Sequence, residues 1–247
     1  MDDVVEQLMA ADDPCIQCRT LVDVCGESPD APQARDLRKA IRSSARVKAL
    51  LSPRGQEGRV PSVYAKYTGA HWVLADLADI GYPPEDTSLV PLRDQVYEHW
   101  LAPDHTRERV VEREAARYKS RPGVPVIDGR ARRCASQEGN ALYATLALGL
   151  ADERADELAA NLIRWQWPDG GWNCDRKTEA RTSSFHETLL VLRGLAWHAT
   201  VTGSEASRAA AERAAEFFLK RRLFRRRTDG SIIHESFLKL KYPHYWH

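Results

Sequence analysis

The sequence contains no long apolar run and no excess of charge of either sign. Its 36 Lys and Arg residues nearly balance 35 Asp and Glu residues, and the formal charge is +1. Nothing global therefore points to a nucleic acid as a partner. No stretch approaches the roughly 18 apolar residues of a membrane span, and the first residues lack the basic start and apolar core of a signal peptide. We expect a cytoplasmic protein without a membrane span.

Cysteine is sparse and odd in number, with Cys15, Cys18, Cys25, Cys134 and Cys174. An odd set spread along the whole chain argues against a disulfide framework and favours reduced thiols. Cys15 and Cys18 have the spacing of half a zinc or redox site, but no second pair or nearby histidine pair completes it, and Cys18 with Cys25 also fits one buried helix face. Glycine-rich phosphate loops, nucleophile elbows and zinc-protease signatures are also absent.

Strand signals are almost absent, because no stretch alternates apolar and polar residues between hairpin turns. Helical periodicity dominates instead, and a hydrophobic content of 43% is enough for a sizeable core. The sequence predicts an all-α protein. The expected helices cover residues 15–25, 33–51, 70–80, 89–100, 106–118, 138–150, 153–166, 184–200 and 204–224, and residues 119–133 form a long irregular stretch.

The most specific motif reads Gln-x-x-x-Gly-x-Trp and runs from Gln166 to Trp172. It follows an amphipathic run, and Pro168 with the glycines after it cannot continue that helix. A glutamine in the last helical turn can bond the free carbonyls, and the glycines permit a tight turn that the tryptophan covers. We interpret Gln166, Gly170 and Trp172 as a structural staple.

This segment resembles the QW motif of the squalene and hopene cyclases, whose relatives include the β subunits of protein prenyltransferases. In that superfamily the motif closes one helical hairpin of an α/α toroid, so the resemblance implies an inner and an outer ring of helices. Residues 1–58 are then an N-terminal helical hairpin packed on the toroid or part of it, and residues 59–247 are the toroid domain. Because the hairpins are too few to close a ring, we expect a ring that is open at the C-terminus or completed by a second chain or copy.

Four polar and aromatic clusters each open an apolar helix, and we align them as degenerate repeats. Equivalent positions in such repeats would meet at the mouth of one cavity. The expected acid–base residues are His71, Glu138, Asp175, His186, Glu187 and His244, with Cys134 beside them. The expected ligand-binding wall is formed by Trp72, Asn140, Tyr143, Trp172, Phe185, Tyr245 and Trp246. The alternative is that these aromatics are core and the histidines are helix-end groups.

The chemistry of the superfamily does not transfer unchanged. Triterpene cyclases use an Asp-x-Asp-Asp motif that this sequence lacks, so squalene cyclisation is not expected. Prenyltransferase β subunits hold zinc through an Asp-x-Cys pair and a histidine in a Tyr-His-Thr segment, which the segment around His186 resembles. Cys174 and Asp175 are adjacent, however, and adjacent side chains tend to point apart. We expect no bound zinc or other cofactor, and if a metal is held, Cys174, Asp175 and His186 are its ligands.

The sequence thus predicts a terpenoid cyclase-like or prenyltransferase-like enzyme. It would act on a hydrophobic, isoprenoid-type small molecule through His, Asp and Glu acid–base groups. Two alternatives stay open: a non-catalytic module that binds a hydrophobic ligand or another subunit, and a zinc-dependent prenyltransferase-like subunit. The basic run from Lys220 to Arg227 is expected to be solvated at a helix end, with a diphosphate or nucleic-acid phosphate site as the alternative.

Overall fold

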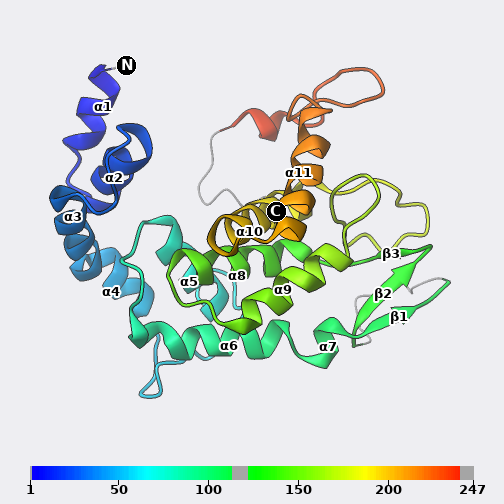
Figure 1. Ribbon diagram of the computed structural model, residues 1–247, viewed down its shortest axis with the longest axis horizontal. Helices are drawn as coiled ribbons and strands as arrows, with labels where there is room; N and C mark the ends of the chain where they lie inside the picture. The colour runs from blue at the N-terminus through cyan, green and yellow to red at the C-terminus, as the bar shows by residue number, and fades with distance from the viewer. Residues whose placement is uncertain (1, 113–121, 240–247) are drawn as a thin grey trace. The chain divides into compact units, whose positions relative to one another are not determined.

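The computed structural model describes residues 2–112 and 122–239, so the candidates His244, Tyr245 and Trp246 lie outside the described residues. Over the described residues the chain is mostly helical, with eleven α-helices and one small three-stranded sheet (Figure 1). It divides into two compact units, Met1–Glu98 with Ala144–Ala151, and His99–Tyr143 with Asp152–His247. The predicted helical character is confirmed, while the two rings of a toroid stay a prediction.

The first unit is built from short helices joined by capped turns. Ser44 is extended and its hydroxyl accepts a bond from the Val47 amide, so the single helix predicted over residues 33–51 is in fact two helices. The elements are α1 (Asp2–Met9), α2 (Pro14–Arg19), a π-helical turn η1 (Thr20–Val24), α3 (Pro32–Ser43), α4 (Ala45–Leu51), α5 (Ala70–Asp79), a 3-10 turn η2 (Thr87–Leu89) and most of α6 (Val90–Trp100).

Helix α5 is the buried centre of this unit. Leu74 and Leu77 are almost wholly buried, as the uniformly apolar sequence of this helix predicts. Its last carbonyls, at Ala78 and Asp79, accept bonds of 2.7 and 3.0 Å from the guanidinium of Arg19. A helix end that would otherwise leave buried acceptors unpaired is thereby satisfied.

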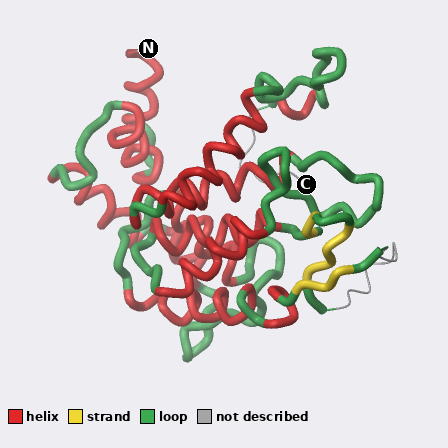
Figure 2. The backbone as a smooth tube through the Cα atoms, turned by 45° about the vertical axis from the view of Figure 1, so that its right-hand side comes forward, coloured by secondary structure: helices red, strands yellow, loops and turns green. Residues whose placement is uncertain are grey.

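The second unit combines helices with the sheet, whose strands are yellow in Figure 2. Strand β1 pairs in parallel with β2, and β2 pairs antiparallel with β3. The elements are α7 (Pro103–Thr106), β1 (Glu108–Val110), β2 (Val124–Ile127), β3 (Arg130–Ala131), most of α8 (Ala135–Ala147), α9 (Glu153–Arg164), α10 (Phe185–Thr202), α11 (Glu205–Leu219) and a 3-10 turn η3 (Glu235–Leu238).

The helix predicted over residues 106–118 is wrong where β1 lies, and part of that range falls outside the described residues. Tertiary contacts override the local helical pattern here. The Glu108 carboxylate accepts a hydrogen bond of 2.9 Å from the indole of Trp165 and forms an ion pair with Arg164. In the sheet, Glu108 is the register partner of Val124. Residues 119–133, predicted to be irregular, contribute β2 and β3.

The predicted turn after α9 has the expected local geometry. Trp172 is 1% exposed, and its indole nitrogen donates to the carbonyl of Leu162. The Gln166 amide donates to the carbonyls of Gly170 and Ala210, 2.8 Å each, which ties the turn both to itself and to α11. These contacts support the interpretation of Gln166, Gly170 and Trp172 as a structural staple, and Trp172, expected in the ligand-binding wall, is instead buried in this turn.

Helices α8 and α10 approach each other backbone to backbone at two glycines. A Cβ added at Gly139 would lie 2.6 Å from the Cα of Val191, and one at Gly194 would overlap the carbonyl of Gly139. Only glycine permits this approach. The close contact brings the first turns of α8 and α10 together, and both carry acidic residues.

Candidate metal centre

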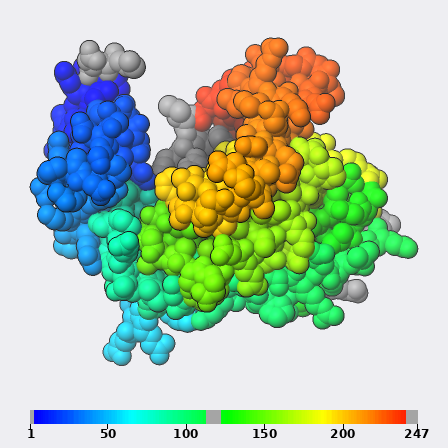
Figure 3. Space-filling view, viewed as in Figure 1, coloured from blue at the N-terminus to red at the C-terminus, as the bar shows by residue number. Residues whose placement is uncertain are grey.

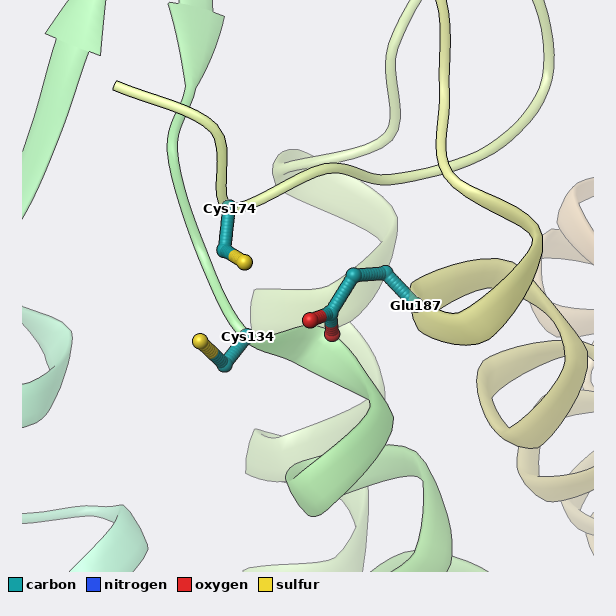
Figure 4. A group of neighbouring side chains, drawn as sticks. All are labelled: Cys134, Cys174 and Glu187. Atoms are coloured by element: carbon teal, nitrogen blue, oxygen red, sulfur yellow. The ribbon is translucent and has the colours of Figure 1, made fainter. Parts of the chain in front are cut away.

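Two thiols and one carboxylate meet in the second unit. The Sγ atoms of Cys134 and Cys174 and a carboxylate oxygen of Glu187 all lie within 4.8 Å of one another. Figure 4 shows the Glu187 side chain extending toward the two cysteines from the start of α10. Glu187 is buried and both cysteines are half-buried. We call these three residues the thiol–carboxylate cluster.

Backbone pairing holds the three segments of the cluster together. Cys134 immediately precedes α8, and Cys174 lies in the loop that follows the staple. The Arg133 amide donates to the Asn173 carbonyl at 3.1 Å, so the residue before each cysteine is bonded to the other segment. The Ser136 amide, in the first turn of α8, donates to Glu187 Oε2 at 2.9 Å. An N-terminal helix amide is a natural partner for a carboxylate.

A second carboxyl group adjoins the cluster. Glu138 is 1% exposed, and Arg133 donates to its Oε1 through Nε and Nη2. Its other oxygen, Oε2, is buried and has no hydrogen-bond partner among the described residues. Burial raises the pKa of Glu138, the charge of Arg133 lowers it, and the charge of Glu187 raises it further. A buried oxygen without a partner is uncommon, and a water molecule, a proton or a bound group would satisfy it.

The electrostatics of the cluster favour a neutral Cys174 thiol in the absence of a cation. The pKa of Cys174 is raised by its hydrogen bond with Cys134, then by burial and by the charge of Glu187. A divalent cation reverses this preference, because thiols deprotonate when they ligate it. Two thiolates and a carboxylate are ligands that zinc accepts, and three protein ligands leave one tetrahedral position open.

Two histidines that the sequence analysis missed lie near Arg133. The rings of His99 and His105 are 4.4 Å apart, and Trp100 packs against both. Burial and then the charge of Arg133 lower the pKa of His105 to about 4 and also lower the pKa of His99. Both imidazoles are therefore neutral at physiological pH, and the low pKa makes His105 a weak base. Their only sequence signal is that both flank the Trp100 segment.

The predicted site residues of the second unit fall into different environments. Asp175 is exposed and accepts a bond from the Lys177 amide of its own loop, and His186 lies beside the ring of Phe237. Neither belongs to the cluster that contains Cys174. Phe185 packs in a group of phenylalanines, Asn140 is buried, and the Tyr143 ring carries the guanidinium of Arg193.

The remaining predicted residues lie in the first unit. His71 and Trp72 are both buried and their rings meet edge to face at 5.5 Å. Tyr64 packs against both. The convergence of His71 with His186 and Asn140 on one cavity stays a prediction, because they belong to different units.

A serine, a histidine and an aspartate also line up elsewhere in the second unit. His198 bonds Ser207 through Nδ1 and Asp156 through Nε2, both at 2.9 Å. Ser207 is fully buried, so its hydroxyl cannot reach a substrate. The three residues come from α10, α11 and α9 and link those helices. We interpret this arrangement as structural.

No protein-family model, curated protein or solved structure matches the chain. Among the described residues, none of the helices has both the length and the apolar character that crossing a membrane requires.

Proposed function

We propose that the protein is a zinc-dependent enzyme whose ion is held by Cys134, Cys174 and Glu187. The observation that carries the proposal is the meeting of three ligand-type atoms from three distant segments within 4.8 Å. Ligand atoms around a tetrahedral zinc lie about 3.3–3.8 Å apart, judging from typical zinc–ligand bond lengths. Side-chain adjustment of about 1 Å would therefore suffice to close the site.

The surroundings of the cluster support an open, reactive position. Zinc bound by three protein ligands keeps a fourth place for water or a substrate atom, and it acts there as a Lewis acid. The orphaned Oε2 of Glu138 is available to hold or accept a proton, with Arg133 fixing the carboxylate through its other oxygen. Cys134 supplies the third ligand that the sequence alone did not assure, which is why the proposal departs from the expectation of no zinc.

The substrate class rests on the sequence motif. The resemblance to the toroid superfamily supports a hydrophobic, isoprenoid-type molecule, and the absence of an Asp-x-Asp-Asp motif argues against squalene cyclisation. We therefore propose a metal-assisted reaction on such a molecule, in the manner of a prenyltransferase-like enzyme.

Elemental analysis of protein prepared without an affinity tag or chelator tests the metal site. We expect about one zinc per chain, which is lost in Cys134→Ser and in Cys174→Ser and weakened in Glu187→Gln. The matched control is Cys25→Ser, because Cys25 is an exposed cysteine outside the cluster. His186→Ala should also keep its zinc. Cobalt substitution adds a second measurement, since thiolate ligation gives a charge-transfer absorption that the two cluster variants should lack.

Three outcomes would contradict the site as drawn. Wild-type protein that takes up no zinc after reduction and reconstitution would remove it. Zinc retained in both cluster variants but lost in His186→Ala would restore the ligand set of Cys174, Asp175 and His186. A disulfide between Cys134 and Cys174 in protein purified under reducing conditions would replace metal binding by redox chemistry.

Turnover is tested separately by mass spectrometry of zinc-loaded protein incubated with farnesyl diphosphate and with farnesol. Product formation that disappears in Cys174→Ser supports the enzyme. If the wild type and Cys174→Ser both bind the ligand saturably and neither forms product, the alternative of a non-catalytic module for hydrophobic ligands is favoured.

A further inference from the structure

A pocket lined almost wholly by cations lies where the chain leaves α11. The chain reverses at Arg222 and Leu223, which both have positive φ, and then forms a tight hairpin in which Arg225 pairs with Ile232. The pocket has a volume of about 330 Å³. Its lining consists of Lys220, Arg221, Arg222, Arg225, Arg226, Arg227 and Gly230, which we call the arginine pocket. These residues belong to the orange part of the chain in Figure 3.

The positive charge of the arginine pocket is only partly balanced by the protein: Asp169 acts on Arg221 and Asp229 acts on Arg226, and neither carboxylate lines the pocket. Its lining contains six cations and no carboxylate. Within the described part of the chain, no ion pair involves Arg222, Arg225, Arg226 or Arg227, and Lys220 reaches Glu216 only at 3.9 Å. Like charges held together in one pocket repel, although solvent screens the exposed ones, and a multivalent anion placed among them would relieve this repulsion.

Helix-end effects explain only part of this cluster. Arg221 donates to the Phe217 carbonyl in the last turn of α11, as expected for a cation at a helix C-terminus. The effect of the helix dipole fades within one turn of the helix end. Arg225 and Arg226 lie beyond the helix, on the hairpin, and the dipole cannot account for their position in the same pocket.

Several of the guanidinium groups are already fixed. Arg221 is 9% exposed and stacks on the Phe217 ring, with its guanidinium carbon 3.9 Å from the ring centroid. Arg225 donates to the Gly230 carbonyl at 2.8 Å, and Arg226 donates to the Ile233 carbonyl at 3.3 Å. Burial lowers the pKa of Arg221, and the charge of Arg227 lowers it further, against the opposite effect of Asp169. Cations held in place lose little conformational entropy when they bind an anion.

We propose that the arginine pocket binds a multivalent phosphate anion, such as the diphosphate or phosphomonoester group of a small molecule. Planar guanidinium groups match the oxygens of phosphate in pairs, and several negative charges are needed to offset this many cations. No aromatic side chain lines the pocket, so the stacking that single-stranded nucleic acid uses has no platform there. The net charge of +1 also gives no long-range attraction for a nucleic acid. The proposal is independent of the zinc site.

Isothermal titration of the full chain with inorganic diphosphate tests the proposal, at low and at moderate ionic strength. We expect saturable binding of one anion. Because a charge-assisted hydrogen bond contributes about 1.5–3 kcal/mol, Arg226→Gln should weaken binding about tenfold or more. Arg226→Lys keeps the charge but loses the planar guanidinium group, so its affinity for diphosphate should lie between those of the wild type and Arg226→Gln. The matched control is Arg208→Gln, which removes one exposed arginine from α11 outside the pocket and should bind like the wild type.

A second arm distinguishes a soluble phosphate from a lipid headgroup. Leu219 and Leu223 flank the pocket and are both 59% exposed, so phosphatidic acid in phosphatidylcholine vesicles is the appropriate probe. Co-sedimentation that is lost in Leu223→Ser and in Arg226→Gln would identify a headgroup, and competition by diphosphate without any effect of Leu223→Ser would identify a soluble ligand. Either result supports a phosphate site.

The proposal is overturned if neither probe binds, or if Arg226→Gln and Arg208→Gln bind diphosphate equally well. Binding of single-stranded RNA without binding of diphosphate would also overturn it. Thermal unfolding of each variant checks that the fold is retained, and Arg226→Lys keeps the test decisive if Arg226→Gln fails to fold.

Discussion

Replacing Gly170 by alanine should destabilise the second unit far more than the same change at Gly203. Both glycines have positive φ, +97° and +74°, so both alanines are strained by about 1–2 kcal/mol. The stiffening of the unfolded chain is the same for both and cancels in the comparison. The surroundings differ: a Cβ at Gly170 would overlap the carbonyl of Arg213, whereas nothing lies within 4 Å of one at Gly203.

The overlap at Gly170 cannot be relieved by rotating a side chain, because the obstacle is backbone. Overpacking of this kind costs about 1–3 kcal/mol. If the turn moves away, the bonds from Gln166 to the carbonyls of Gly170 and Ala210 weaken, each worth about 1 kcal/mol. We expect a loss in the free energy of unfolding of about 3–5 kcal/mol for Gly170→Ala and about 1 kcal/mol for Gly203→Ala.

Urea unfolding followed by tryptophan fluorescence measures the difference, since Trp165, Trp167 and Trp172 surround the turn. The midpoints are comparable only if both variants keep the wild-type slope. Losses that agree to within about 1 kcal/mol would mean that the close approach of the turn to α11 contributes nothing beyond backbone strain, and the staple interpretation would fail.

Two further predictions concern Trp172 and Asp76. Trp172→Ala should lower the free energy of unfolding by about 2–5 kcal/mol, because the side chain is 1% exposed and its indole donates to the Leu162 carbonyl. The control Trp197→Ala should lower it clearly less, because Trp197 is 42% exposed. Equal melting temperatures of the two variants would contradict this prediction. Burial, with the charge of Asp79, raises the pKa of Asp76 to about 6. The protonated carboxyl therefore stabilises the fold fully below about pH 4, and this stabilisation is lost as the pH rises through about 6. The variant Asp76→Asn should consequently be more stable than the wild type by about 1–2 kcal/mol above about pH 7. Near about pH 4 it should be no more stable than the wild type. Thermal unfolding across this range would refute it if the difference were independent of pH.

Strong helical periodicity predicted most of the helices to within a few residues. The apolar spacing over residues 153–166 and 184–200 identified α9 and α10, because each has one face that must be buried. The failures occurred where a tertiary partner decides the local structure. Strand β1 exists because it pairs with β2 and because Glu108 accepts the indole of Trp165, neither of which is visible in a local window.

The residues of the thiol–carboxylate cluster were expected near one site, but no bound metal was predicted there. Cys174 and Glu187 were both among the candidate residues, and Cys134 was placed beside them, but His186 and Asp175 were named as the companions of Cys174. Which of two adjacent residues at a helix start faces a loop depends on the rotation of that helix. Here the glycine contact between α8 and α10 sets that rotation, and it directs Glu187 rather than His186 toward the thiols. The spacing of residues in the sequence does not reveal this rotation of α10.

The turn from Gln166 to Trp172 also positions the candidate ligands. The Trp172 amide bonds the Thr188 hydroxyl at 3.2 Å, and the Trp172 carbonyl accepts the Ser184 amide at 2.8 Å, so the segment before Cys174 is fastened to the start of α10. On its other side the Asn173 carbonyl accepts the Arg133 amide. The bonds that hold the cysteine segments are thus main-chain bonds and one bond to the Thr188 hydroxyl, and none of them uses a cysteine side chain, whereas Glu187 is itself bonded by the Ser136 amide. Substituting a thiol should consequently remove the metal without unfolding the site, which is what makes the loss of zinc in Cys134→Ser and Cys174→Ser a measure of ligation.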